Sequence, residues 1–143
     1  MIVISANNAV RLCDAARGAG ADISGAVFRV GGEPLTPAKH KLIRQAGAGT
    51  FSGWAMAEIG PIAGGCAGAT EPDEMHLFSG KVAVIQRHKV LPDAETSLDA
   101  FFLSTLLPSC PKIMLNVDTG DYGVMNQRRC GCALEQAGLL THV

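Results

Sequence analysis

Charged residues and long apolar runs are both scarce in this chain of 143 residues. Charged side chains make up 17% of it, against about 25% in a typical soluble domain. The 12 basic and 13 acidic side chains give a net charge of −1, which argues against a nucleic-acid partner, because such proteins carry a clustered basic excess. Apolar runs such as 82–85 and 100–103 are far shorter than the roughly 20 residues that span a bilayer, so we expect no membrane partner.

Several standard signals are also missing. No basic stretch precedes the short apolar patch near the N-terminus, so residues 1–8 do not form a signal peptide. Neither Gly-x-x-x-x-Gly-Lys nor Gly-x-Gly-x-x-Gly occurs, which excludes the two standard phosphate loops. The 5 cysteines are an odd number, so free thiols or metal ligands fit better than a disulfide framework, and we expect a cytoplasmic protein.

The first part of the chain shows helical and strand patterns in alternation. Small or apolar residues recur at helical spacing over 6–20, and 26–30 reads as a buried strand. Thr36 and Pro37 then mark the start of a second helix, because a threonine caps first-turn amides and proline suits the first helical position. A second strand is predicted at 50–54. This order favours adjacent parallel strands, so we assign residues 1–60 to a βαβ-like α/β segment.

The composition changes after about residue 60. Residues 61–72 form a Gly- and Ala-rich connector. Short strand candidates follow, each bounded by turn residues, at 75–78, 81–85, 101–105 and 112–117. We therefore expect residues 61–143 to form a small β-rich subdomain or open barrel.

Three stretches could carry chemistry, and each has an ordinary structural alternative. At Gly31-Gly32-Glu33-Pro34, paired glycines allow a backbone to approach a flat ligand closely, although the stretch also suits a strand-to-helix turn. At 54–60, Glu58 could hold Mg²⁺ beside phosphates, or be a solvated loop residue, and Trp54 could stack on a base or pack in the core. At 118–123, an aspartate could accept two ribose hydroxyls, or the stretch could be a hairpin bend.

Taken in order, these stretches resemble a known enzyme superfamily. Gly-Gly-Glu-Pro, then aromatic-x-Met-x-Glu-x-Gly, then Thr-Gly-Asp is similar to the adenylate-forming superfamily, and in particular to the phenylacetate-CoA ligases among the acyl-CoA synthetases. The likeness covers about 23–138. It implies that residues 1–60 end an α/β nucleotide-binding subdomain, and that Gly31, Gly32, Glu33 and Pro34 line an adenine pocket.

The resemblance also assigns the other nucleotide contacts. It implies that Trp54 stands where the family has tyrosine, that Ala55 and Met56 continue this wall, and that Asp121 is the ribose-binding aspartate. Glu58 matches the magnesium-binding glutamate, which makes it the expected catalytic residue. Ala57 departs from the family pattern, because it replaces a threonine or serine that contacts the α-phosphate.

The resemblance further implies what the whole enzyme does. We expect an AMP-forming acid–thiol ligase that activates a small-molecule carboxylic acid with ATP and Mg²⁺ and transfers the acyl group to coenzyme A. The family's phosphate loop and its C-terminal lobe with the catalytic lysine are not found in these 143 residues. We therefore expect the chain to be an internal segment of the large N-terminal lobe, and to be inactive alone.

Cysteine and histidine residues in the second part suggest a metal site. Cys66, His76, Cys130 and Cys132 could form a closed tetrahedral Cys₃His site, since zinc prefers sulfur and nitrogen ligands. The phenylacetate-CoA ligase-like proteins carry a similar Cys…His…Cys-x-Cys set, which supports a structural zinc ion. The alternative is small buried cysteines and an exposed histidine without metal.

A function of another class stays open from the sequence. The chain could be a stand-alone zinc-stabilised binding or assembly module without catalysis, which requires only the cysteine and histidine set and an apolar surface. Apolar residues reach 48%, so exposed apolar strands should drive self-association, and we expect a homodimer.

Overall fold

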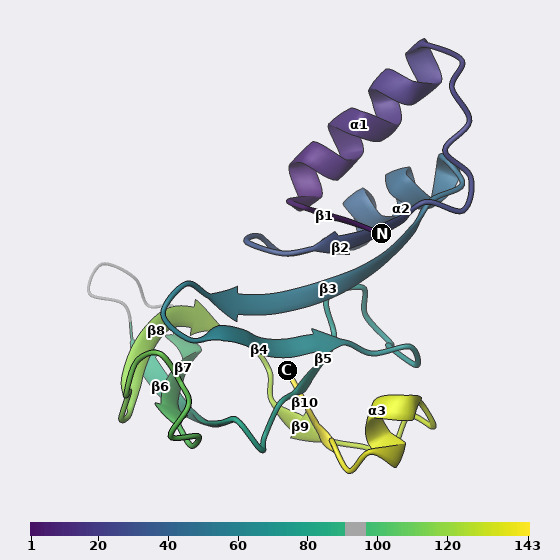
Figure 1. Cartoon of the computed structure of the whole chain (residues 1–143). Coiled ribbons are helices and arrows are strands. Elements are labelled where there is room, and N and C mark those ends of the chain that lie inside the picture. The colour runs from purple at the N-terminus through teal and green to yellow at the C-terminus, as the bar shows by residue number, and fades with distance from the viewer. Residues whose placement is uncertain (91–96) are drawn as a thin grey trace.

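The structure is a computed structural model that describes residues 1–90 and 97–143. Its strands form two sheets, one of seven strands in the order β1-β2-β3-β4-β5-β10-β9 and one of three strands in the order β6-β7-β8. Figure 1 shows helices α1 and α2 together at one end, beside β1, β2 and the start of β3, while β9 and α3 lie at the other end. The mixed α/β class expected from the sequence is confirmed.

The N-terminal end of the large sheet is parallel. Strand β2 (Val27–Val30) lies between β1 (Ile2–Ile4) and β3 (Gly49–Met56) and pairs with both in parallel. Helix α1 (Ala6–Gly18) connects β1 to β2, and α2 (Pro37–Gln45) connects β2 to β3. The predicted order of helices and parallel strands is thus confirmed. Strand β1 is additional, because the sequence analysis described the N-terminal residues only as a short apolar patch.

Apolar packing explains why this end folds. One face of α1 and one side chain of α2 pack on the strands, with Phe28, Val30 and Ile43 at most 1% exposed. Thr36 caps α2 as predicted, since its hydroxyl accepts from the backbone N–H of Lys39.

The large sheet then becomes antiparallel. Strand β3 pairs with β4 (Gly60–Gly65), which pairs with β5 (Met75–Leu77), so the sheet continues across the predicted boundary at residue 60. Strand β10 (Thr141–His142) joins β5 to β9 (Asn126–Gln127). The predicted connector at 61–72 was wrong for its first residues, because small side chains here let β4 pack closely against its neighbours.

The small sheet consists of β6 (Val82–Val90), β7 (Ser97–Thr105) and β8 (Val117–Tyr122), all antiparallel. The strand predicted at 112–117 was wrong: strand pairing starts only at Val117 and covers the residues proposed as a possible bend. Of the apolar residues in 112–117, only Met114 is buried, since Ile113 is 92% and Leu115 78% exposed.

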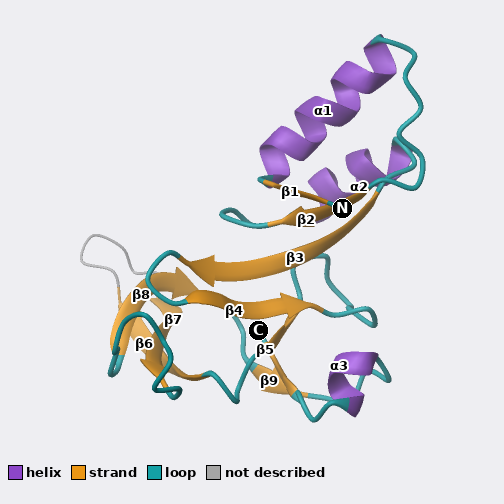
Figure 2. Cartoon of the chain, in the orientation of Figure 1, coloured by secondary structure: helices purple, strands orange, loops and turns teal. Residues whose placement is uncertain are grey.

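The remaining helix is short. Helix α3 (Ala133–Gln136), a short helix in Figure 2, follows the Cys-Gly-Cys stretch. It contains no buried residue. Among the described residues, no helix is long and apolar enough to cross a membrane.

Candidate functional site

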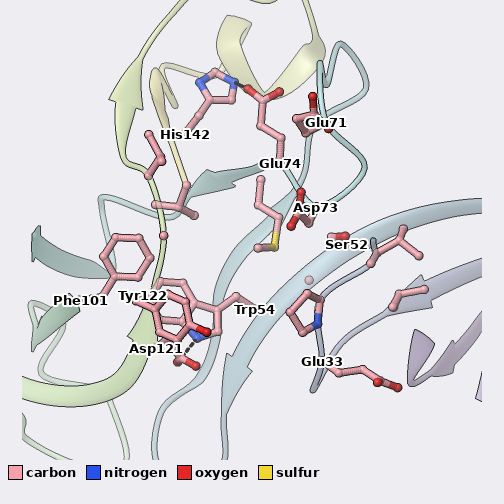
Figure 3. A pocket seen from close by; sticks show the side chains of 18 of the residues that line it. Glu33, Ser52, Trp54, Glu71, Asp73, Glu74, Phe101, Asp121, Tyr122 and His142 are labelled. Atoms are coloured by element: carbon pink, nitrogen blue, oxygen red, sulfur yellow. Dashed lines mark hydrogen bonds and ion pairs between the residues drawn. The ribbon is translucent and has the colours of Figure 1, made fainter. Parts of the chain in front are cut away.

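A cavity of about 730 Å³ opens where the carboxyl end of β2 and the end of β3 face β8 of the small sheet. Its size falls within the roughly 300–1,000 Å³ of small-molecule sites. Figure 3 shows Trp54, Asp121 and Tyr122 grouped in one part of its wall, and Glu74 and His142 in another. The wall therefore combines predicted nucleotide contacts with residues near the predicted metal site.

The Gly-Gly-Glu-Pro stretch forms the rim next to β2. Gly32, Glu33 and Pro34 line the cavity. The Glu33 carboxylate accepts hydrogen bonds from the backbone N–H of Asn7 at 2.7 Å, from the Asn7 side chain at 2.7 Å and from Lys39 at 3.2 Å. The bond from the Asn7 backbone lowers the pKa of Glu33. Glu33 thus fixes the rim to the starts of both N-terminal helices.

Gly31 has a different position, since it is not among the described residues that line the cavity. It lies against β3, and a Cβ at Gly31 would be 2.9 Å from the carbonyl oxygen of Gly53. Only glycine allows this approach without a shift of the backbone. Gly31 thus allows the rim to pack directly against β3.

Trp54 and Asp121 connect the two sheets across the cavity. The Trp54 Nε1–H donates to Asp121 Oδ2 at 2.9 Å, although the residues are 67 positions apart in the chain. The Trp54 ring lies 5.5 Å from the ring of Phe101, centroid to centroid. Both residues line the cavity with Ala55, so the structure brings them together with Gly32, Glu33 and Pro34.

Two further predicted residues lie elsewhere. Met56 packs against the second apolar cluster of the molecule, and Glu58 is exposed in the turn between β3 and β4. Neither is among the described residues that line the cavity, whose acidic wall instead includes Glu71, Asp73 and Glu74. Sequence reasoning missed these three, because Glu71 lay in the predicted connector at 61–72, and Asp73 and Glu74 lay between it and the strand predicted at 75–78.

Cysteine and histidine side chains converge beside this acidic wall. Ligand atoms of Cys66, His76, Cys130 and His142 all lie within 4.8 Å of one another. Cys132 also belongs to the cluster, since its Sγ lies 3.1 Å from His76 Nε2, while Cys130 Sγ lies 3.5 Å from the same nitrogen. The four predicted residues therefore come together, and His142 joins them.

His142 was missed for a topological reason. It comes next to His76 only because β10 pairs with β5 and places the two residues opposite each other. Their ring centroids are 4.1 Å apart. His142 follows His76 by 66 residues, a spacing that matches no metal-binding motif. Only the pairing of two very short strands therefore reveals their contact.

The cluster has the chemistry of a metal site. His76 Nδ1 lies 2.7 Å from the carbonyl oxygen of Leu139, which only accepts, so Nδ1 carries the hydrogen and the Nε2 lone pair is directed to the cysteines. This arrangement is usual for metal-binding histidines. Burial raises the pKa of Cys66 to about 12, helped by Cys130, so its thiolate needs a nearby cation.

Polar contacts hold the cluster from outside. The Glu74 carboxylate accepts hydrogen bonds from Arg128 Nε at 2.6 Å and from the backbone N–H of Thr70. Burial raises the pKa of Glu74, but these hydrogen bonds outweigh burial, so the pKa lies below its usual value. Glu135 accepts from the backbone N–H groups of Cys130 and Gly131. The loop after β4 packs closely against the Cys-Gly-Cys turn, since a Cβ at Gly68 would be 2.7 Å from the Cys130 carbonyl oxygen.

The pKa of Cys132 is shifted in the opposite direction to that of Cys66. Backbone N–H groups of α3, first that of Glu135, lower the pKa of Cys132 to about 6. All 5 cysteines are free in the structure, as expected for thiols that are unpaired or bind metal.

Comparison with known proteins identifies the fold. No family model and no curated protein matches the chain. One similar solved structure is described as an open conformation of 2-hydroxyisobutyryl-CoA ligase in complex with 2-HIB-AMP and CoA, with a TM-score of 0.73 and 16% sequence identity. The match covers 98% of this chain and 33% of that chain, so the present chain spans about a third of that ligase. The resemblance predicted from the three motifs is therefore confirmed at the level of fold: the chain folds as one third of an acyl-CoA ligase does.

Proposed function

We propose that the chain supplies adenine, ribose and magnesium contacts to an ATP-dependent, acyl-adenylate-forming acid–thiol ligase. The observation that carries this proposal is the Trp54–Asp121 hydrogen bond across a cavity whose rim is Gly32–Pro34. The fold supports it, because a solved ligase of this fold is in complex with 2-HIB-AMP and CoA. The acid that is activated is a small-molecule carboxylate, and coenzyme A is the acyl acceptor.

The proposed reaction has two steps. A carboxylate oxygen of the acid attacks the α-phosphorus of ATP, and the bond to pyrophosphate breaks, which gives the acyl-adenylate. The thiolate of coenzyme A then attacks the acyl carbonyl, and AMP leaves. Such catalysis depends mainly on positioning and on neutralisation of phosphate charge.

Asp121 is the proposed ribose contact. Its carboxylate can accept from two ribose hydroxyls, since a carboxylate has about four lone-pair sites and the indole of Trp54 uses one of them. The indole bond orients the carboxylate before a ligand binds. The adenine ring would lie between the Gly32–Pro34 backbone and Trp54, where the family has tyrosine.

Glu58 is the proposed magnesium ligand and the catalytic residue of this segment. Magnesium is usually held by one or two carboxylates, phosphate oxygens and water. The exposed Glu58 carboxylate, four residues after Trp54 and outside the cavity wall, would meet the ion where the phosphates extend beyond the cavity. The ion would neutralise phosphate charge during adenylation. Ala57 offers no hydroxyl to the α-phosphate. We propose that this chain alone is inactive, because the family's phosphate loop and catalytic lysine are not found in its residues.

A structural zinc ion is part of the proposal. Cys66, His76 and Cys130 would hold it. For the fourth ligand the sequence predicts Cys132, and the structure also brings His142 to the same cluster. Such an ion would tie the end of β4, β5 and the Cys-Gly-Cys turn together. Structural zinc contributes about 10–16 kcal/mol in small peptides, which is comparable to the stability of a whole domain.

Nucleotide binding can be tested through a natural reporter. Trp54 is the only tryptophan and lines the cavity, so AMP binding should change the intrinsic fluorescence. Asp121→Asn should weaken AMP binding by 10-fold or more, because hydrogen bonds to a charged group contribute about 1.5–3 kcal/mol. Asp118→Asn is the matched control, since Asp118 lies in the same strand but pairs with Lys89. Equal loss of affinity in both variants, or no AMP binding by the wild type, would contradict the proposal.

Activity of the segment is tested separately. We expect no ATP–pyrophosphate exchange from the purified chain with any carboxylic acid supplied. Exchange above the background of a Glu58→Gln variant would show that the chain is catalytically complete, and would refute its role as a segment.

The second candidate is a zinc-stabilised binding or assembly module without catalysis. The cysteine and histidine cluster favours it, because a metal site of this kind needs no nucleotide. AMP binding that depends on Asp121 would exclude this candidate. A cytoplasmic location and a homodimer stay predictions, and light scattering that shows a monomer at high concentration would contradict the dimer.

A further inference from the structure

His142 carries a buried nitrogen without a partner. The residue is 1% exposed, and its Nε2 is the buried side-chain atom among the described residues that makes no hydrogen bond. Nδ1 lies 3.2 Å from the carbonyl oxygen of Leu140, so Nδ1 carries the hydrogen and Nε2 bears a lone pair. Glu74 Oε1 is 3.8 Å away and has no hydrogen to donate when ionised. A buried nitrogen without a partner destabilises the fold, so a lone pair in this position calls for an electrophilic partner.

A metal ion in the cluster would be such a partner. His142 belongs to the group whose ligand atoms lie within 4.8 Å of one another, with Cys66, His76 and Cys130. For zinc–sulfur bonds of 2.3 Å and zinc–nitrogen bonds of 2.0–2.1 Å, a tetrahedral site places sulfur and nitrogen ligands about 3.6 Å apart. The 3.5 Å between Cys130 Sγ and His76 Nε2 fits this separation. Cys132 Sγ, at 3.1 Å from the same nitrogen, is closer than two ligands of one ion should be.

We propose that His142 is the fourth metal ligand, in a site made of Cys66, His76, Cys130 and His142, and that Cys132 lies outside it. This inference rests on the metal part of the proposed function. Cys132 then serves as the residue that starts α3, where it contacts His76 without binding the ion.

The test is a count of ligand atoms in the full chain. Zinc loaded into the purified protein should show two sulfur and two nitrogen neighbours by X-ray absorption spectroscopy, at one equivalent per chain. Cys132→Ala should keep one equivalent and the same count. His142→Ala should lower zinc affinity at least 10-fold, measured by competition with a chromophoric chelator.

His142→Cys keeps the test decisive if His142→Ala fails to fold. The proposal predicts that this variant binds zinc with three sulfurs and one nitrogen. A wild-type count of three sulfurs and one nitrogen, unchanged in His142→Cys, would overturn it while leaving the zinc site itself intact. A wild type that binds no zinc would overturn the metal site as well, and the AMP titration followed by Trp54 fluorescence would still report on nucleotide binding independently.

Discussion

The two ends of the large sheet are held together in different ways. At the parallel end, β1, β2 and β3 are covered by helices whose small and apolar side chains are buried with Phe28 and Ile43. At the other end, β5, β9 and β10 have only two or three residues each, and α3 buries none. Polar groups dominate there, namely the cysteine and histidine cluster and the Glu74–Arg128 pair. From this difference we propose that apolar packing suffices for one end, while the other depends on charged pairs and on the proposed metal ion.

The largest expected effect comes from removing the metal. A chelator should abolish hydrogen-exchange protection at residues 66–76 and 126–142 and leave 27–30 and 49–56 protected, because only the first group is tied by the cluster. Exchange measured by mass spectrometry with and without added zinc checks this. Equal loss of protection at both ends would show that the metal does not stabilise one end of the sheet more than the other.

The next effect should fall on the parallel end. Phe28→Ala removes a ring that is 1% exposed and should lower the free energy of unfolding by about 3–5 kcal/mol, with bound zinc unchanged. Leu115→Ala, at a side chain that is 78% exposed, is the control and should change it by less than about 0.5 kcal/mol. Urea unfolding and metal analysis give the two readouts. Zinc loss in Phe28→Ala would show that the two ends are not independent.

A smaller effect is expected at the pair that supports the cluster. Glu74→Gln removes the charge that Arg128 binds and should cost about 1–3 kcal/mol at pH 7. The folded-state pKa of Glu74 is lowered, so its stabilisation is complete above the unfolded value of about 4.3 and is lost as the pH falls through the folded value. In the zinc-loaded chain, the difference in the free energy of unfolding between wild type and variant, measured with urea, should therefore shrink as the pH falls from 7 toward 3. Glu71→Gln, at an exposed neighbour, should keep the wild-type curve.

The smallest effect is expected where the two sheets meet. Trp54→Phe keeps an aromatic ring beside Phe101 but removes the donor to Asp121, and should weaken AMP binding about 2- to 10-fold, as expected for one hydrogen bond. Calorimetry is the measurement, since the variant has no tryptophan. Unchanged affinity would show that Asp121 does not need the indole for its orientation.

Sequence reasoning succeeded where local chemistry decides the structure. Thr36 and Pro37 begin a helix through their own capping properties, and the buried strand that contains Phe28 has a simple apolar pattern. The same reasoning failed where distant partners decide. The glycines of β4 were predicted as a connector because close packing of Gly64 against the Phe78 ring is visible only in three dimensions.

The candidate site follows the same division. The motifs around Glu33, Trp54 and Asp121 were recognisable because their order in the chain resembles a family, and the structure places all three around one cavity. His142 and the acidic wall at Glu74 carried no such signal, since they approach the cavity only through strand pairing and loop packing. Spacing alone does not predict contacts made by strands of two or three residues.

The Glu33 carboxylate has one further consequence. Because it accepts hydrogen bonds from Asn7 at the start of α1 and from Lys39 in α2, it joins the cavity rim to both helices. An outward shift of the rim would break contacts with two helices at once. Under the proposed function, Asn7, although not among the described residues of the cavity wall, would thus help to set the shape that the base meets.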